Sequence, residues 1–247
     1  MYEEFAQVYD LFMENIDYDR WCARLTDMLT SRGISDGLVC DLCCGTGSIS
    51  ERHAGAGYDM IGIDASPEML EEALRKRDAS EHDILYLCQD ARAFELYGTV
   101  RAVISVCNSL NYILETEALR QVFRLVNNYL DPGGIFLFDL NMEPHYAAIG
   151  EETIAEVRDE ACFVWENHYD AANQINEYLL TLFVRERGAA YRRYEELHVQ
   201  RAYSLAEIRT LITEAGMEYL GAWEAYTDTP PTDASKRLLF AARERGK

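Results

Sequence analysis

The sequence has little positive charge and no long hydrophobic run. The first absence argues against a nucleic-acid partner and the second against a membrane partner. Lys and Arg together number 23 against 43 Asp and Glu, which gives a formal net charge of −20 at pH 7. A phosphate backbone is bound through clustered Lys and Arg, so we expect no nucleic-acid partner. No stretch approaches the roughly 20 apolar residues that a membrane span requires, so we expect no membrane partner.

The start of the chain also lacks the features of a secretory signal. The first residues, MYEEFAQVYD, are acidic, without a basic segment, an apolar run or a cleavage site. The seven cysteines are an odd number, and Cys40, Cys88 and Cys107 lie within apolar runs, where Cys behaves as a small hydrophobic residue. Such thiols suit a reducing compartment, so we expect a cytoplasmic protein.

Hydrophobic residues nevertheless make up 49% of the 247 residues, enough for one large α/β domain or two small ones. Helical spacing predicts one or two helices over 9–29, a helix beginning at Ser66–Pro67, and another over about 116–130. Asp131–Gly134 is expected to be a tight turn. Buried strands are expected at residues 38–42, 58–64, 84–88, 102–107 and 135–140. This alternation predicts a Rossmann-like parallel sheet with helices on both faces.

The pattern changes near residue 150, where hydrophobic side chains begin to alternate with a period of two. This period predicts an inserted antiparallel sheet of three or four strands. Its segments are 162–169, 175–185 and 190–203. A helix and two strands then return to the main sheet, at residues 204–216, 217–226 and 237–242.

These elements divide the chain into two parts. Residues 1–150 and 204–247 are expected to form the Rossmann-like domain, with 1–33 as an N-terminal helical lid. Residues 151–203 are expected to form the inserted sheet, either as a roof over the substrate or as a dimer surface. We therefore expect a monomer or a homodimer.

The glycine-rich loop after the first buried strand distinguishes two cofactor classes. The dinucleotide fingerprint G-x-G-x-x-G needs a third glycine, which the segment Gly45–Ser50 lacks. Asp41 lies four residues before the first glycine, where it would repel a pyrophosphate and attract a cation. A nicotinamide-dependent oxidoreductase is therefore the weaker alternative. S-adenosylmethionine, with its sulfonium and ammonium groups, is favoured.

Asp41-x-Cys43-x-Gly45-x-Gly47 resembles the acidic-x-Gly-x-Gly-x-Gly loop of class I S-adenosylmethionine-dependent methyltransferases. Asp64 ends the second strand 17 residues after Gly47, where a carboxylate can accept hydrogen bonds from both ribose hydroxyls. Asp90, after the third strand, resembles the acidic residue of the family that faces the adenine amino group. The resemblance therefore implies a class I methyltransferase sheet that binds S-adenosylmethionine and releases S-adenosylhomocysteine.

The N-terminal segments Phe5–Asp10 and Ile16–Trp21 resemble a bacterial small-molecule subgroup of this family, which includes amino-sugar N-methyltransferases and glycine N-methyltransferase. By that likeness Tyr9, Tyr18 and Trp21 close over the methionine end of the cofactor, or else form only the apolar face of a helix. The cofactor-binding residues that the resemblance implies are Tyr9, Tyr18, Trp21, Asp41, Cys43, Gly45, Thr46, Gly47, Asp64, Ala65, Met69, Asp90, Ala91, Cys107 and Asn108.

Cys43 is a departure from the family, which usually has Gly there. If this position requires positive φ, a side chain costs on the order of 1 kcal/mol or more, so we expect a tightened loop that still works. Cys40 and Cys43 also form a C-x-x-C pair. A redox or zinc role would need a helix start or a second such pair, so neither role is favoured.

Methyl transfer from a sulfonium is a direct displacement, so the protein mainly aligns the nucleophile with the methyl carbon and sulfur, and no metal is required. Tyr112 lies where related small-molecule enzymes place a His or Tyr near the methyl group. The candidate catalytic residues are Tyr112 and His198, and His145 is a further candidate base because neutral pH lies near the usual pKa of His. The candidate substrate-contacting residues are Asn111, Tyr112, Trp165, Tyr169 and Arg193. Those on the inserted sheet could equally be exposed or packing residues.

The sequence thus predicts a cytoplasmic S-adenosylmethionine-dependent methyltransferase that methylates nitrogen or oxygen of a small molecule. A sensor or regulatory protein that binds the cofactor without catalysis remains an alternative, because of Cys43 and because no general base is identified. The identity of the acceptor does not follow from the sequence.

Overall fold

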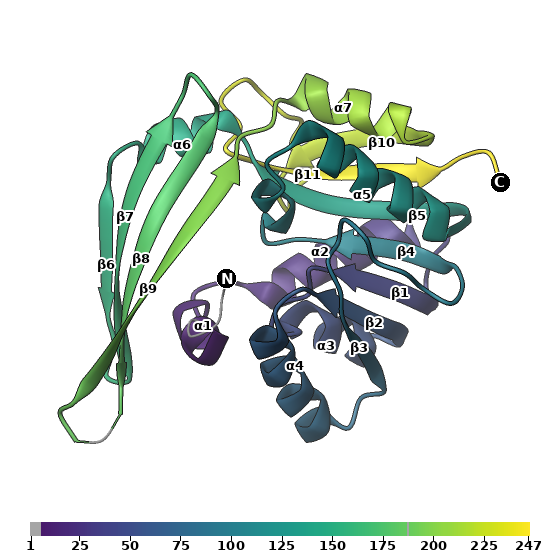
Figure 1. The fold of residues 1–247 in the computed structure, drawn as a ribbon. Helices are drawn as coiled ribbons and strands as arrows, with labels where there is room; N and C mark the ends of the chain where they lie inside the picture. Colours follow the sequence, from purple (N-terminus) through teal and green to yellow (C-terminus); the bar gives the residue numbers. More distant parts are fainter. Residues whose placement is uncertain (1–5, 187) are drawn as a thin grey trace.

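The computed structural model describes residues 6–186 and 188–247, and contains one seven-stranded and one four-stranded sheet (Figure 1). The strand order of the large sheet is β10-β11-β5-β4-β1-β2-β3. Its strands are β1 (Gly37–Leu42), β2 (Tyr58–Asp64), β3 (Ile84–Cys88), β4 (Val100–Ser105), β5 (Leu130–Asn141), β10 (Met217–Glu224) and β11 (Arg237–Glu244). Strands β1 to β5 run parallel, and β11 is antiparallel to both β5 and β10. The predicted α/β class is confirmed.

Helices connect these strands and cover both faces of the sheet (Figure 1). They are α1 (Ala6–Phe12), α2 (Tyr18–Thr30), α3 (Ser48–Gly55), α4 (Pro67–Ser80), the 3₁₀ helix η1 (Ser109–Tyr112), α5 (Thr116–Tyr129), α6 (Glu143–Ile149) and α7 (Leu205–Glu214). The cap expected at Ser66 is present: its hydroxyl accepts the Met69 N–H at 3.2 Å, with Pro67 in the first turn. Ser204 caps α7 in the same way through the Glu207 N–H. In the described part of the chain, no helix is long and apolar enough to cross a membrane.

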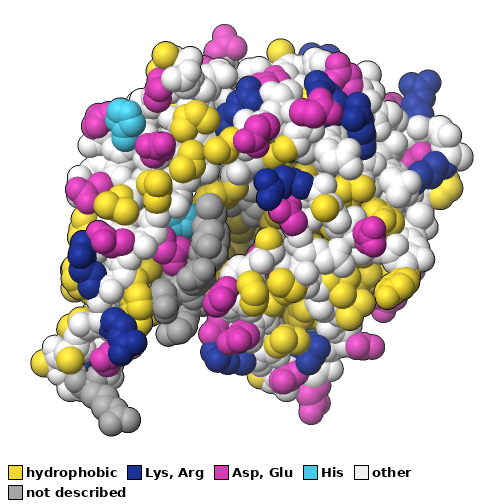
Figure 2. All heavy atoms as spheres, viewed as in Figure 1, with side chains coloured by type: hydrophobic (Ala, Val, Ile, Leu, Met, Phe, Trp, Pro, Cys, Tyr) yellow, Lys and Arg dark blue, Asp and Glu magenta, His cyan; other side chains and the backbone are white. Residues whose placement is uncertain are grey.

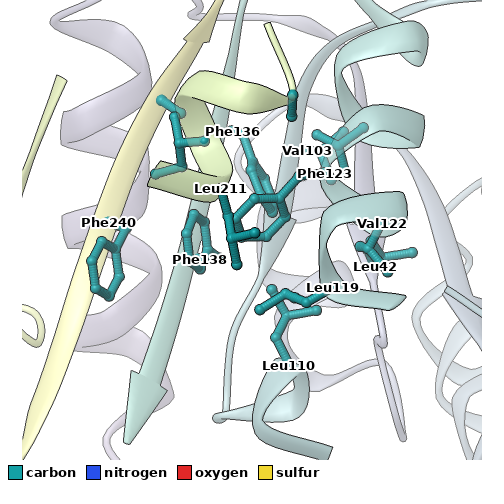
Figure 3. Close-up of a cluster of buried hydrophobic side chains, with 14 of the residues drawn as sticks. Leu42, Val103, Leu110, Leu119, Val122, Phe123, Phe136, Phe138, Leu211 and Phe240 are labelled. Carbon is teal, nitrogen blue, oxygen red and sulfur yellow. The ribbon is translucent and has the colours of Figure 1, made fainter. Parts of the chain in front are cut away.

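The core is packed on both faces of β5, whose residues Ile135–Asn141 are buried. On one face, rings of β5, α5 and β11 pack together below α7 (Figure 3). Phe138 lies between Phe240 at 5.0 Å and Phe136 at 4.5 Å, centroid to centroid, and Phe123 packs edge-on against Phe136. Aromatic contacts of this kind add about 0.5–1.5 kcal/mol each beyond area burial. They hold the middle of the sheet rigid beneath its carboxyl edge.

The second sheet is antiparallel, in the order β6-β7-β8-β9. Its strands are β6 (Thr153–Val157), β7 (Ala161–Asp170), β8 (Ile175–Arg185) and β9 (Tyr191–Arg201). One face packs on α1, where Val8 and Phe12 contact the buried Leu180 and Leu182. The sheet therefore stands beside α1 (Figure 1), and the end of β9 reaches α5 and α7, where Arg201 donates to Thr116 and Glu207.

Two local predictions differ from the structure. β4 ends at Ser105, before the expected 107, because Cys107 and Asn108 have positive φ values of 62° and 51°. Asp131–Gly134 belongs to β5 instead of a separate turn. Leu130 pairs with Val100 and Ile135 with Ala102, so the four residues between them form a bulge-like interruption at which Gly133 has φ 75°.

Candidate cofactor and acceptor site

A cavity of about 290 Å³ lies at the carboxyl ends of β1, β2 and β4 and is closed on one side by α1 and α2. Open α/β sheets bind ligands at this edge, where the strand order reverses between β1 and β4. The lining residues are Tyr9, Tyr18, Asp41, Cys43, Cys44, Gly45, Thr46, Ser48, Ile49, Asp64, Ala65, Ser66, Met69, Ala91, Val106, Cys107, Ser109 and Tyr112. Viewed as in Figure 1, the molecular surface is hollowed between the second sheet and the main sheet (Figure 2).

The glycine-rich loop turns sharply between β1 and α3. Cys43, Gly45 and Gly47 all have positive φ, at 63°, 55° and 74°. A side chain at Gly47 would collide with the Tyr86 hydroxyl, whereas a Cβ at Gly45 would meet no atom within 4 Å. Gly45 therefore leaves room beside the cavity, and Gly47 is needed for close packing. Cys43 thus has the positive φ at which a side chain is strained, and a loop that still works stays a prediction.

Asp41 is a buried carboxylate in the cavity wall, with only 1% of its surface exposed. The Ser50 hydroxyl donates to it at 2.6 Å. Burial, with a smaller contribution from the nearby Asp64, raises the pKa of Asp41 to about 7, although the hydrogen bonds from Ser50 act in the opposite direction. A cationic ligand would stabilise the charged form, so this carboxylate is suited to bind one.

Asp64, at the end of β2, connects the glycine-rich loop with the start of α4. One carboxylate oxygen accepts the Gly45 N–H at 2.8 Å, and the other accepts the Ser66 N–H at 2.9 Å. Burial raises the pKa of this carboxyl, while these backbone donors lower it. Asp64 also lines the cavity, and a carboxylate has about four acceptor sites, more than these backbone donors use.

Asp90 has a different environment from the other two carboxylates. It is 42% exposed and pairs with Arg92, whose Nη2 lies 2.5 Å from its Oδ2. The hydrogen bonds from Arg92 hold the pKa of Asp90 below its usual value. The described residues that line the cavity include its neighbour Ala91 but not Asp90, so the adenine-facing role of Asp90 stays a prediction.

The segment after β4 brings a phenol to the cavity. The Asn108 N–H donates to the buried Asp139 at 2.6 Å, and the Asn111 side chain bonds the backbone of Asn141 as both donor and acceptor. These contacts position η1, so that Cys107 and Tyr112 line the cavity. Asn108 bonds through its own backbone N–H and Asn111 through its side chain, and neither is among the described residues that line the cavity.

Tyr112 also reaches the second sheet. Its hydroxyl lies 2.6 Å from the Tyr178 hydroxyl and 3.1 Å from Nδ1 of His198. The Trp165 ring stacks on Tyr178 at 3.9 Å. The candidates Tyr112, His198 and Trp165 therefore form one continuous group, although the described lining of the cavity includes only Tyr112 of the three.

The remaining acceptor candidates lie elsewhere. Tyr169 stacks on Tyr146 at 5.8 Å. Arg193 is 56% exposed and pairs with Glu195 at 2.5 Å. Burial lowers the pKa of His145 to about 4, so this side chain is neutral at physiological pH. A substrate role for Tyr169 or Arg193 stays a prediction.

α1 and α2 contribute Tyr9 and Tyr18 to the cavity, and their closure over the methionine end of the cofactor stays a prediction. Trp21 stacks on Tyr226 at 4.2 Å, with the Arg237 guanidinium 4.5 Å from its ring. Arg237 in turn pairs with the fully buried Asp139 at 2.6 Å. In this structure Trp21 therefore anchors α2 to the sheet.

A polar latch that the sequence did not indicate joins α1 to the glycine-rich loop. Lys76 of α4 lies 2.6 Å from Asp10 and donates to Thr46 and Ser48 at 3.0 and 2.8 Å. The Thr46 hydroxyl donates to Asp10 at 2.8 Å. No local motif indicates this contact, because the three segments are far apart in sequence.

Six of the residues that line the cavity were not identified from the sequence, although several of them are adjacent in sequence to residues that were identified. Cys44 and Ser48 lie within or beside the glycine motif, and Ser66 follows Ala65, so inclusion of motif neighbours would have found them. The complete set is Cys44, Ser48, Ile49, Ser66, Val106 and Ser109.

Comparisons with known proteins agree with this geometry. Residues 39–134 match a model of the methyltransferase domain. YqeM of Bacillus subtilis, a protein named as a methyltransferase, is 33% identical over 99% of this chain and 97% of its own length. This chain belongs to the S-adenosylmethionine-dependent methyltransferases.

Two further relatives extend the likeness over the whole fold. An S-adenosylmethionine-dependent methyltransferase of Clostridium acetobutylicum has a structure with a TM-score of 0.89 and 26% identity, and each chain is covered over 99%. A dTDP-3-amino-3,4,6-trideoxy-alpha-D-glucopyranose N,N-dimethyltransferase of Streptomyces venezuelae is 29% identical over 89% of this chain and 94% of its own. The predicted fold and enzyme class are confirmed.

The residues present fit S-adenosylmethionine. Gly45 leaves open space at the loop, and the charged side chains of the described lining are the two carboxylates Asp41 and Asp64. A sulfonium and an ammonium suit this electrostatic environment. Among the described residues, no group of three or more His, Cys, Asp or Glu side chains is placed to hold a metal ion.

Proposed function

We propose that this enzyme methylates the amino nitrogen of a small molecule. The observation that carries the proposal is the position of the Tyr112 phenol, which lines the same cavity as the two buried carboxylates. An amine arrives largely as an ammonium ion, which a cavity with acidic walls attracts. The Streptomyces venezuelae relative is named for N,N-dimethylation of an amino sugar, which supports nitrogen over oxygen.

The cofactor would be held by residues at the ends of β1 and β2. Asp64 would accept the ribose hydroxyls, the backbone of Cys43–Gly45 would lie against the donor, and Asp41 would stabilise its positive charge. Tyr9 and Tyr18 would cover it and exclude water, with the Asp10–Lys76 latch holding α1 in place. When bound, S-adenosylmethionine supplies an activated methyl group on a sulfonium, so we propose that no metal takes part.

The acceptor would approach from the side of Tyr112, between η1 and the second sheet. The phenol would orient the nitrogen, and alignment of this kind can lower the activation barrier by about 7–11 kcal/mol. The second sheet would then be a substrate roof. All seven cysteines are free thiols, which agrees with our proposal that the enzyme works in the cytoplasm.

The test is an incubation of the purified enzyme with methyl-labelled S-adenosylmethionine and a panel of small molecules. Each amine in the panel, from amino sugars to alkyl amines, is paired with its hydroxyl counterpart, and products are analysed by mass spectrometry. We expect label on nitrogen with release of S-adenosylhomocysteine. Label on hydroxyl members alone, or on none, would overturn the proposal, and binding without turnover would instead favour a sensor.

A further inference from the structure

The Tyr112 hydroxyl is the first of three groups that lead from the cavity into the second sheet. His198 of β9 is fully buried, and its Nδ1 lies 3.1 Å from the Tyr112 hydroxyl. Its other ring nitrogen, Nε2, lies 3.4 Å from Oε2 of Glu196, whose side chain is 10% exposed. Glu196 and His198 are two residues apart on one strand, so they share the face that packs toward α1.

Tyr178 holds this group in a fixed orientation. Its ring stacks on His198 with an angle of 7° and a centroid distance of 4.6 Å, and Trp165 supports its other face. The His198 ring also packs edge-on against Tyr112. Within residues 6–186 and 188–247, the titratable groups that face His198 include Tyr112 from η1, Tyr178 from β8 and Glu196 from β9.

The hydrogen bonds have a preferred direction. Either phenol can donate in the bond between Tyr112 and Tyr178, so the direction is set by His198: when its Nδ1 carries no proton, it accepts from Tyr112, whose oxygen then accepts from Tyr178. The negative charge of the Glu196 carboxylate, 3.4 Å from Nε2, favours a proton on that nitrogen.

We propose that Tyr112, His198 and Glu196 form a proton relay that deprotonates the ammonium form of the acceptor. The acceptor nitrogen gives one proton to the Tyr112 oxygen, and the phenol proton moves to Nδ1 of His198. The resulting imidazolium is balanced by Glu196. The freed lone pair forms the N–C bond, while the S–C bond breaks and its electron pair stays on sulfur. The proton leaves His198 for solvent after turnover.

In this relay Tyr112 is the catalytic residue, and His198 and Glu196 act through it. The inference rests on the proposed amine acceptor, because an acceptor that arrives neutral needs no proton acceptor before attack. A positioned acid or base contributes typically 10²–10⁴-fold to the rate. A group that merely joined η1 to the second sheet would contribute equally for every acceptor.

The first test needs no acceptor. The full-length protein, labelled with ¹⁵N in its histidines and saturated with S-adenosylhomocysteine, is examined by NMR, and H198Q assigns the signal. We expect the neutral tautomer protonated at Nε2, with Nδ1 as an acceptor. A tautomer protonated at Nδ1 would overturn the relay, whatever the substrate is.

The second test compares two acceptors of similar shape, ethylamine and 2,2,2-trifluoroethylamine, in single-turnover methylation at neutral pH. Ethylamine is cationic there, whereas fluorine lowers the basicity of the second amine so that it is largely neutral. We expect H198Q and Y112F to lower the rate with ethylamine by about 100-fold or more, and far less with the fluorinated amine. Higher pH should restore the variants with ethylamine, and E196Q should show a smaller loss of the same kind.

H168Q is the matched control, because His168 lies in the same sheet, is 59% exposed and pairs with Glu151. It should behave as the wild type does, and all variants should bind S-adenosylhomocysteine normally. Equal losses with both amines would indicate a structural role and overturn the relay. Failure of the wild type to methylate either amine would count against the amine acceptor, a result separate from the tautomer.

Discussion

Replacement of Asp41 by Asn should weaken donor binding while it stabilises the free protein. The carboxylate is 1% exposed and its pKa is raised to about 7. One pKa unit corresponds to about 1.36 kcal/mol. Ionisation of Asp41 in the folded protein therefore costs about 4 kcal/mol more than ionisation of an ordinary Asp. Asn removes that charge and can still accept the Ser50 hydroxyl.

The sign of the pH dependence follows from proton binding. Between about pH 4 and pH 7 the native protein keeps the Asp41 proton that the unfolded chain loses, so the stability of the wild type falls as pH rises through this range. Asp41→Asn should therefore raise the free energy of unfolding by up to about 4 kcal/mol at pH 8, and by less than half of that at pH 5. Urea unfolding at the two pH values measures the difference.

Donor binding should respond in the opposite direction. A hydrogen bond to a charged group contributes about 1.5–3 kcal/mol, so the variant should bind S-adenosylmethionine about 10- to 150-fold more weakly at pH 8. The wild-type affinity should fall as pH drops below about 7, where Asp41 becomes protonated, whereas this pH dependence should be reduced in the variant. Calorimetric titration measures both affinities. Asp59→Asn, at an exposed position of β2, is the control.

Unchanged affinity in Asp41→Asn would refute the reasoning about donor recognition. A variant less stable than the wild type at pH 8 would refute the reasoning about the buried charge. The two readouts are independent, so each can fail alone.

Three further changes test other parts of the structure. Asp64→Ala should weaken binding of S-adenosylhomocysteine by about 1.5–3 kcal/mol, and equal calorimetric affinities would show that this carboxylate does not contact the ligand. Arg237→Met leaves the buried Asp139 without its cation and should lower the free energy of unfolding in urea by about 3–5 kcal/mol. A loss below about 1 kcal/mol would mean that the remaining hydrogen bonds to Asp139 are enough to stabilise its charge. Cys43→Gly relieves a positive φ and should raise stability by about 1 kcal/mol, seen as a higher melting temperature. A lower one would mean that the half-buried thiol contributes more than the strain costs.

Much of the fold could be predicted because its signals are local. β2 lies at the predicted residues 58–64, and β8 at 175–185, since hydrophobic period and turn residues act over a few positions. Ser66 and Ser204 cap the helices that they were predicted to begin. The end of β4 was placed two residues too late, because the apolar run continues through Cys107 while the backbone turns toward Asp139.

The site residues that follow strand ends could be predicted from the sequence. The contacts that depend on how distant segments pack could not. Asp41, Asp64 and Tyr112 line the cavity because parallel strands end at one edge. Asp90 follows the same rule but pairs with Arg92, two residues away. The contact between Tyr112 and His198 spans 86 residues, and it depends on the angle at which the second sheet packs, which no local pattern reports.

The central claim is that the carboxyl edge of the sheet binds the donor through Asp41 and Asp64, with the reacting end toward Tyr112. A crystal structure of the complex with S-adenosylhomocysteine tests it most directly. We predict the ribose hydroxyls within hydrogen-bond distance of Asp64, the amino-acid end beside Asp41, and the sulfur facing the side of the cavity that Tyr112 lines. A ligand bound elsewhere, or one that leaves both carboxylates without contact, would contradict the account.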